Sequence, residues 1–439
     1  MDSAQLLAQA GFQLDTGNTA WILTSATLVL LMTVPALAFF YGGLVRTKSV
    51  LNMMMLSFGA AGVVGVIWVL WGYSMSFGSD VGGLFGNPAE LFGLTKLTAD
   101  SPTNALAGSG VPAWVWVGFQ ATFAVITVAL VSGALADRVR FGPWLIFTAV
   151  WSTLVYFPMC HMVWGGGMLG GEGWVAKLFA TPLDFAGGTV VHINAGTAGL
   201  VLALLIGKRH GFGKIPMRPH NVPFVMLGAA LLWIGWFGFN AGSAGAANDQ
   251  AGLAWVNTFV ATAAAALGWA LTERIKDGKA TSVGVASGIV AGLVAITPGA
   301  GFVSPLGAIA IGFTAGVLCT LAVGLKFKWG YDDSLDVVGV HLVGGLVGTV
   351  MVGLFATEAN LWEGARAGLF YGGGLSQLLS QVAAAAFAVV FSGLVTAAIG
   401  VVIKQTITWR VTQGEEVSGI DLAQHGETAY ETLASGRFN

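Results

Sequence analysis

The sequence predicts an all-α polytopic membrane protein, because charge is scarce, long apolar runs recur, and basic residues gather in alternate loops. Of 439 residues, 55% are hydrophobic and only 9% are charged, whereas a soluble domain carries about 25% charged side chains. Too little polar surface remains to coat a large globule, which excludes a cytosolic enzyme, a nucleic-acid-binding protein and a secreted disulfide scaffold. Cys160 and Cys319 lie in apolar runs, so we expect neither disulfides nor a cysteine metal site.

Eleven apolar windows approach the roughly 20 residues that a transmembrane helix needs. The first follows residues 1–18, which contain no Lys or Arg, so we expect a retained helix and not a signal peptide. The polar, irregular segment 78–112 is expected to form a lid or cap. The predicted spans are 19–44, 49–77, 113–135, 141–164, 185–206, 222–242, 251–272, 281–298, 304–325, 336–355 and 377–403.

The basic residues fall almost entirely on one side when alternate loops are assigned to opposite sides. The other side holds only Lys96, Lys177 and Arg366, while acidic residues divide almost evenly. Short loops rich in Lys and Arg stay in the cytoplasm, which predicts an outer N-terminus and a cytoplasmic C-terminus. The basic residues predicted to be cytoplasmic are Arg46, Lys48, Arg138, Arg140, Lys208, Arg209, Lys214, Arg218, Arg274, Lys276, Lys279, Lys326, Lys328, Lys404, Arg410 and Arg437.

Two weak similarities, five spans apart, indicate an internal repeat. FFYGGL (39–44) ends the first span and FGFNAGS (237–243) the sixth, while VVH and GVH end at His192 and His341 in spans five and ten. Five spans per half force opposite orientations, which is the inverted-repeat plan of many transporters. The predicted organisation is an extracytoplasmic N-terminus at 1–18, five-helix halves at 19–206 and 222–355, a cytoplasmic linker at 207–221, an eleventh helix at 377–403 and a cytoplasmic tail at 404–439.

His192 and His341 are ionisable groups inside predicted spans, where an unpaired charge costs at least about 2.5–3.5 kcal/mol. His192 lies about 12 Å along its helix from Asp184, and His341 about 7.5 Å from Asp336 in the opposite direction, so the two rings should approach each other near mid-membrane. Two neutral imidazoles can share one hydrogen bond and still face a permeant molecule. Each could instead be an ordinary polar contact between helices. No third ligand at helical spacing supports a metal site.

Asp184 and Asp336 precede these histidines at the predicted helix starts. An aspartate is a favoured helix N-cap, and its charge is stabilised at a helix N-terminus. Asp184 could also add a negative field to a cation site, whereas we expect Asp336 simply to cap its helix. His161, near the outer end of the fourth span, is expected to be structural.

Several aromatic side chains should lie at the depth of Asp184, at the outer ends of spans three, four and six. Aromatic residues near an interface are usually belt residues. A group of rings with one hydroxyl and one carboxylate also suits a small desolvated cation, since a dry cation–π contact is worth about 2 kcal/mol. The residues of this predicted cluster are Phe119, Phe123, Trp164, Phe239 and Ser243.

The segment DFAGGTVVHINAG (184–196) resembles the signature of the Amt/Mep/Rh ammonium transporters, and the similarity extends over nearly the whole chain. The bacterial and archaeal Amt branch is also similar at FFYGGLVR (39–46), GALADRVRF (133–141) and HMVWGGG (161–167). Further similar segments are WFGFNAGSAG (236–245), DVVGVH (336–341) and HGETAY (425–430).

The resemblance implies a homotrimer of eleven-helix subunits in the inner (plasma) membrane, each with its own pore and with no cofactor. Phe123, Trp164 and Ser243 would form the outer ammonium site, supported by Asp184. Phe123 and Phe239 would form a stacked gate beside Phe119. His192 and His341 would line the pore. In related proteins the tail and inner loops receive a PII-type signalling protein, which makes such a protein a candidate partner.

The hypothesis favoured by these residues is a transporter, not an enzyme, that deprotonates ammonium outside and conducts ammonia past the two histidines. We expect the proton to follow separately, which makes uptake electrogenic; its return to the outside would make uptake electroneutral. The alternatives are an ammonium sensor that signals through its tail, a two-histidine membrane metalloenzyme, and a neutral-gas or urea channel.

Overall fold

Polar side chains mark where several spanning helices begin. Asn221 accepts a hydrogen bond from the backbone N–H of Phe224 (3.0 Å) at the start of α11 (Val222–Gly242). Thr281 caps α13 (Ser282–Ile296) in the same way. An oxygen acceptor at this position satisfies a backbone donor that the first turn leaves unpaired. These caps give apolar segments defined starting points.

The computed structural model describes residues 12–101 and 106–430. Within these ranges ten helices are long and apolar enough to cross a membrane, and the shorter α13 adds an eleventh apolar helix. The first half contains five spans. The first two consist of α2 (Thr16–Leu31), η1 (Met32–Leu37) and α3 (Ala38–Leu44), and of η2 (Thr47–Ser49), α4 (Val50–Ile67), η3 (Trp68–Gly72) and α5 (Tyr73–Phe77). The other three consist of α6 (Ala113–Val131) with η6 (Ser132–Leu135), of α7 (Phe141–Trp151), η7 (Ser152–Tyr156) and α8 (Phe157–Trp164), and of η8 (Gly188–Ile193) with α10 (Asn194–Ile206).

The second half begins with α11, α12 (Asp249–Asp277) and α13, in that order. The remaining spanning elements are α14 (Pro305–Val323) and α15 (Leu325–Trp329), η9 (Val338–Leu342) and α16 (Val343–Phe355), and the long α17 (Ser376–Thr406). Parts of the predicted N-terminal segment and tail, at residues 1–11 and 431–439 and including Arg437, lie outside the described residues.

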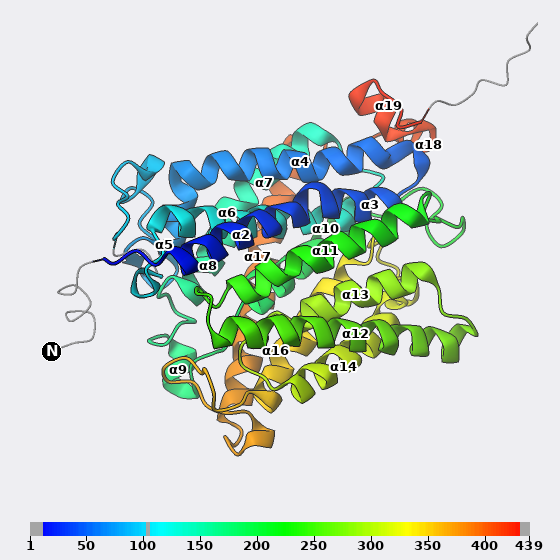
Figure 1. Ribbon diagram of the computed structural model, residues 1–439. Coiled ribbons are helices and arrows are strands. Elements are labelled where there is room, and N and C mark those ends of the chain that lie inside the picture. Colours follow the sequence, from blue (N-terminus) through cyan, green and yellow to red (C-terminus); the bar gives the residue numbers. More distant parts are fainter. Residues whose placement is uncertain (1–11, 102–105, 431–439) are drawn as a thin grey trace, which may run out of the picture.

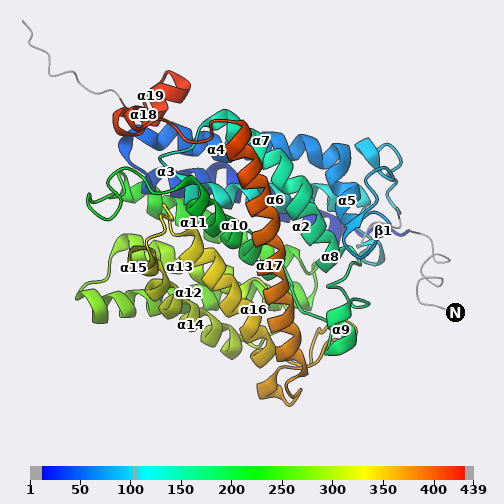
Figure 2. The ribbon, with the colours of Figure 1, turned by 180° about the vertical axis from the view of Figure 1, so that it is seen from behind.

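The spanning helices form a bundle whose two ends differ (Figure 1). One end, the tail face, carries α18 (Gln413–Ser418) and α19 (Ile420–His425). The opposite end, the loop face, carries the connecting segments near the N-terminus of the described chain. Figure 2 shows α17 crossing the outside of the bundle diagonally from one face to the other.

The segment 78–112, predicted to form a lid, contains short regular elements among its described residues. A two-residue hairpin pairs β1 (Asp80–Val81) with β2 (Phe85–Gly86) in antiparallel register. The other short elements of the connections are η4 (Phe92–Leu94), η5 (Ala107–Ser109), α9 (Trp174–Leu178) and η10 (Leu369–Tyr371).

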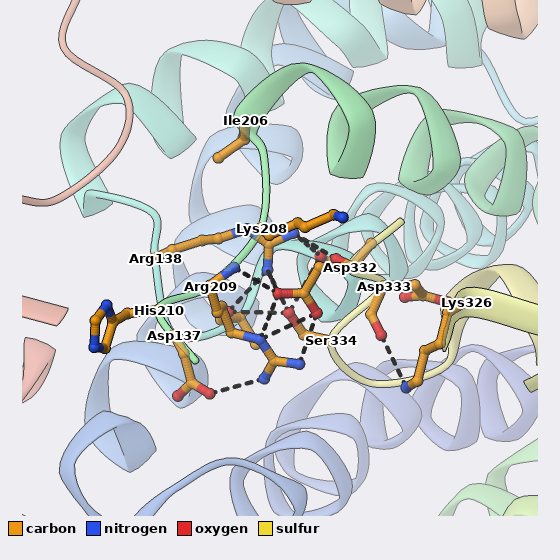
Figure 3. A network of polar contacts seen from close by, with 12 residues as sticks. Asp137, Arg138, Ile206, Lys208, Arg209, His210, Lys326, Asp332, Asp333 and Ser334 are labelled. Carbon is orange, nitrogen blue, oxygen red and sulfur yellow. Dashed lines mark hydrogen bonds and ion pairs between the residues drawn. The ribbon is translucent and has the colours of Figure 1, made fainter. Parts of the chain in front are cut away.

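A buried network of charges ties together the tail-face connections of the two halves (Figure 3). Arg209, which follows α10, bridges Asp137 (3.0 Å) and Asp332 (2.8 Å). Arg138 donates to the backbone carbonyl of Asp332 and to the hydroxyl of Ser334. Burial lowers the pKa of Arg138 to about 10. Burial alone would raise the pKa of Asp332, but its hydrogen bonds and attraction to Arg209 lower it. The network fixes the segment that leads into η9.

Candidate functional site

The two histidines meet inside the bundle. His192 lies in η8 and His341 in η9, and their Nδ1 atoms are 3.3 Å apart. The rings are nearly parallel, with an interplanar angle of 22°. Both side chains are almost completely buried. One Nδ1 must donate and the other accept, so the neutral pair presents one Nε2 acceptor and one Nε2–H donor. The Nε2 of His192 has no hydrogen-bond partner among the described residues.

A glycine four residues after each histidine allows this close approach. A Cβ at Gly196 would lie 2.3 Å from the backbone nitrogen of Leu342. A Cβ at Gly345 would lie 3.1 Å from the Cβ of His192. Residues four apart share one helix face, so each histidine-bearing segment presents a small residue to the other. The motif His-x-x-x-Gly is therefore the sequence signal for the crossing.

Asp184 caps the segment that carries His192. Its carboxylate accepts from the backbone N–H groups of Gly187 (2.8 Å), Gly188 (2.6 Å) and Thr189 (2.8 Å), and from the Thr189 hydroxyl. The φ angle of Gly187 is 121°, a conformation that favours glycine. The side chain is 2% exposed. Asp184 is thus an N-cap whose charge is held by backbone donors.

The prediction that Asp336 caps the helix of His341 is wrong. Asp333 holds that place, accepting from the backbone N–H groups of Val337 (3.1 Å) and Val338 (2.7 Å). Asp336 instead pairs with Lys326 (2.6 Å). Asp333 precedes His341 by eight residues, the same interval that separates Asp184 from His192. The repeat therefore pairs Asp184 with Asp333, not with Asp336.

Three phenylalanines lie above the histidine pair, towards the loop face. Phe123 of α6 and Phe239 of α11 stack with centroids 4.1 Å apart and an interplanar angle of 18°. Phe119 contacts Phe123 edge-on at 4.9 Å. Phe239 in turn lies 6.2 Å from the His192 ring. The stacked pair is fully buried and separates the histidines from the loop face.

A cavity of about 340 Å³, which we call the vestibule, is lined by residues that include Trp164 and Ser243. Trp164 also packs against Phe123 of the stacked pair. Trp164 is perpendicular to Phe123, and its indole N–H donates to the backbone carbonyl of Asp184 (2.9 Å). The Ser243 hydroxyl donates to the Phe239 carbonyl (2.8 Å). Of the predicted cluster, Trp164 and Ser243 line this vestibule, whereas Phe119, Phe123 and Phe239 are buried and are not among its lining residues.

The vestibule contains polar groups that the sequence argument missed. Gln120 and Gln250 line it, and Trp362 reaches it from the segment after α16. The Oε1 atom of Gln120 is buried without a partner among the described residues. An amide has no charge, so the cost of an unpaired charge inside a span does not point to it. Gln120, three residues before Phe123 on the same helix face, was the available signal.

His161 lies away from the histidine pair. Its Nε2 is 2.9 Å from a carboxylate oxygen of Asp80, and its Nδ1 is 3.1 Å from the backbone carbonyl of Ser76. The hydrogen bond to His161 lowers the pKa of Asp80. His161 therefore anchors the hairpin of the loop face to α8.

Sequence comparison identifies close relatives over almost the full chain. A model of the Ammonium Transporter Family matches residues 20–430. An ammonium transporter of Mycobacterium tuberculosis is 58% identical and covers 96% of this chain and 92% of its own. The ammonium transporter Amt1 of Archaeoglobus fulgidus is 44% identical over 94% of this chain and 99% of its own.

Solved structures share the fold. The crystal structure of Candida albicans Mep2 matches with a TM-score of 0.83 and 35% identity, over 95% of this chain and 91% of that one. A structure described as a sensor Amt protein matches with a TM-score of 0.83 and 29% identity, over 93% and 98% of the respective chains.

Proposed function

The chain belongs to the ammonium transporter family, and from that premise we propose that it recruits ammonium in the vestibule and conducts ammonia past His192 and His341. Transport of ammonium is the function that the family and the named relatives support. The observation that carries the mechanism is the 3.3 Å pair of Nδ1 atoms beneath the stacked phenylalanines.

Recruitment uses the vestibule, because it combines aromatic surface with a nearby anion. An ammonium ion at Trp164 would gain a cation–π contact worth about 2 kcal/mol when dry and could donate to the Ser243 hydroxyl. The Asp184 carboxylate is occupied by backbone donors, so it acts through its field and through the carbonyl that holds the Trp164 indole.

The stacked rings of Phe123 and Phe239 form the gate. A centroid separation of 4.1 Å leaves no path between them, so one ring must rotate for each passage. Phe119 supports Phe123 from the side. Ammonium deprotonates before or at this point, since a charge beyond it would lose its hydration without gaining a counter-ion.

Ammonia suits the histidine pair because it can both donate and accept. The pair supplies one acceptor and one donor at its two Nε2 atoms. Potassium cannot become neutral by losing a proton, so the apolar path excludes it. Separate transfer of the proton along the histidines would make uptake electrogenic, whereas its return to the starting side would make uptake electroneutral.

The one-sided distribution of Lys and Arg supports a cytoplasmic tail face in the inner (plasma) membrane. We take the homotrimer implied by the family as the assembly. A PII-type protein, if present, would dock on the tail face, where the inner loops and the tail come together. The likeness to a sensor Amt protein favours one second function, ammonium sensing through α18 and α19.

Reconstitution into liposomes tests the proposal. An ammonium pulse should produce a current that protein-free liposomes lack, with internal pH recorded in parallel by a trapped dye. A pH change without current would indicate electroneutral transport. Absence of both signals, with ammonium binding retained, would favour the sensor and contradict the transporter.

A further inference from the structure

The vestibule is larger than ammonium requires. Its volume of about 340 Å³ is many times the space that one water-sized molecule occupies. Its polar lining residues are Gln120, Ser243 and Gln250, and none of the described residues that line it is acidic or basic. A cation larger than ammonium therefore has room to enter without meeting a fixed positive charge on the wall.

Four aromatic side chains contribute to the walls of the vestibule, and they come from different parts of the chain. Trp116 lies in α6 and Trp164 in α8, whereas Phe185 precedes η8 and Trp362 follows α16. Trp164 and Trp362 are only partly buried, so both tryptophans offer accessible surface to a molecule in the vestibule. The aromatic surface of the vestibule thus extends beyond Trp164.

Contacts outside the vestibule hold these rings in place. Phe302 packs edge-on against Phe185 and also against Trp362, with centroids 5.2 Å apart in each pair. Gln250 donates to the carbonyl of Asn360 (3.3 Å), two residues before Trp362. Side chains that are already fixed lose little conformational freedom when a ligand binds. The aromatic walls are therefore organised in advance of binding.

An uncharged aromatic enclosure suits quaternary ammonium cations in particular. A quaternary ammonium has no N–H group, so it needs no hydrogen-bond acceptor, and its methyl groups can lie against aromatic rings. Aromatic cages recognise such cations through cation–π contacts. Acidic residues also outnumber basic residues in the segments of the loop face, and the resulting field favours a cation over a neutral molecule.

The stacked phenylalanines stop such a cation from going further. Ammonium can continue as ammonia once it has lost a proton, whereas a quaternary ammonium has no proton to lose. The rings of Phe123 and Phe239 are buried with centroids 4.1 Å apart, and a permanent charge beyond them would have neither water nor a counter-ion. A quaternary ammonium would therefore stay in the vestibule.

We propose that the vestibule binds quaternary ammonium cations against Trp164 and Trp362, and that a bound cation blocks ammonium uptake. This inference rests on the proposed recruitment of ammonium in the same vestibule, because the cation can block uptake only where ammonium must pass. The binding itself depends on the aromatic walls and not on transport.

Isothermal titration calorimetry of the full chain in detergent, at constant ionic strength, tests the binding. Choline is the probe, and 3,3-dimethylbutan-1-ol is its neutral counterpart, because a carbon atom replaces the charged nitrogen. Choline should bind about tenfold more tightly than the alcohol, or better. Equal affinities would overturn the proposal, since apolar surface alone would then account for the binding.

Substitutions at Trp362 separate the vestibule from other aromatic surfaces. Tryptophan makes the best cation–π contact, phenylalanine makes a weaker one, and leucine makes none. Choline affinity should therefore decrease from the wild type to Trp362→Phe and again to Trp362→Leu, where the loss is about tenfold.

Trp114→Leu is the matched control, because Trp114 is a tryptophan of α6 that is 52% exposed and does not line the vestibule. It should leave choline affinity unchanged. Wild-type affinity in both Trp362 variants, or an equal loss of affinity in Trp114→Leu, would refute binding against Trp362.

Liposomes test the block separately, with current and internal pH recorded together. Choline added with the ammonium pulse should reduce ammonium uptake, more ammonium should restore it, and choline alone should produce no current above that of protein-free liposomes. Uptake that saturating choline does not lower, or a choline current, would overturn the block. Retained ammonium uptake without choline binding would contradict this inference and leave the proposed function intact. Choline binding without any ammonium uptake would support the binding site and contradict the proposed function.

Discussion

Two buried histidines in this protein, His192 and His161, differ in the partners of their ring nitrogens. The Nε2 of His192 has no partner among the described residues, whereas both ring nitrogens of His161 contact oxygen atoms. Position within a span therefore does not distinguish them, but their partners do. We propose that the free nitrogen of His192 faces the permeant molecule, whereas His161 holds the hairpin of the loop face.

This difference predicts unequal effects on transport. His192→Ala should lower ammonium flux about tenfold, the cost of about one hydrogen bond in the transition state. His161→Ala should lower the thermal unfolding midpoint with little change in flux per folded molecule. Flux in liposomes, normalised to folded protein, checks both. Equal losses of flux in the two variants would refute the pore role of His192.

Asp333 is a second residue whose environment sets a measurable property. Burial raises its pKa to about 6, an effect that the nearby charge of Lys326 partly offsets. A carboxyl whose pKa is higher in the folded state than in the unfolded state binds its proton more readily when folded. It therefore contributes most stability below about pH 4, and that contribution declines as the pH rises through 6.

Asp333→Asn should remove this decline. Between pH 4 and pH 7 the wild type should lose about 2 kcal/mol that the variant retains, because each pKa unit corresponds to about 1.4 kcal/mol and part of the effect lies below pH 4. Unfolding of both proteins in detergent, measured across this range, checks the slope. Asp277→Asn, at an exposed position, serves as the control. Parallel pH profiles for wild type and Asp333→Asn would show that Asp333 does not titrate as proposed.

At the scale of elements, the crossing of η8–α10 with η9–α16 sets the distance between the histidines. Gly196 and Gly345 permit that crossing, because larger side chains would meet the facing segment. The two aspartate caps fix where each segment begins. The arrangement is repeated in the two halves, which explains why both histidines follow their caps by eight residues.

Gly196→Ala tests this crossing. The added methyl would lie 2.3 Å from the backbone nitrogen of Leu342, so the segments must separate, at a cost of about 1–3 kcal/mol. Gly62→Ala is the matched control, because its Cβ would have no neighbour within 4 Å. Unfolding midpoints and ammonium flux should both fall only in Gly196→Ala. A fall of equal size in Gly62→Ala would contradict the assigned role of the crossing.

The limits of prediction from sequence are clearest at element boundaries. Hydropathy predicts α11 at its observed bounds, but α12 continues past the predicted end at residue 272 to Asp277. Its last turns are polar, and hydropathy does not detect a helix that leaves the membrane. The span predicted from residue 185 begins at Gly188, because the Asp184 carboxylate accepts from the backbone N–H groups of Gly187, Gly188 and Thr189 at the start of the helix.

Some of the site residues were predictable from the sequence and others were not. Trp164, Ser243 and the histidines were predictable because they are polar or aromatic groups at matching depths. Asp333 was not predictable, because Asp336 lies nearer to His341 in the sequence. Only the left-handed backbone of Asp336 (φ 65°) and its contact with Lys326 show that Asp336 does not occupy the cap position. Gln120 was not predicted because it has no charge, so the cost of an unpaired charge inside a span does not single it out.

At the scale of the whole molecule, the tail-face network and the tail connect both halves. Arg209 bridges Asp137 of the first half and Asp332 of the second (Figure 3). From the tail, Asp421 accepts from the backbone N–H groups of Leu51 (3.1 Å) and Asn52 (2.8 Å) at the start of α4. Basic side chains are thus concentrated at one end, while the path through the centre is almost free of charge.

We propose that this path conducts a neutral molecule and rejects ions of similar size. The most direct test is the current across protein-containing liposomes after matched pulses of ammonium and potassium, at equal concentration and pH. We expect an ammonium current, with no potassium current above that of protein-free liposomes. A potassium current comparable to the ammonium current would contradict it.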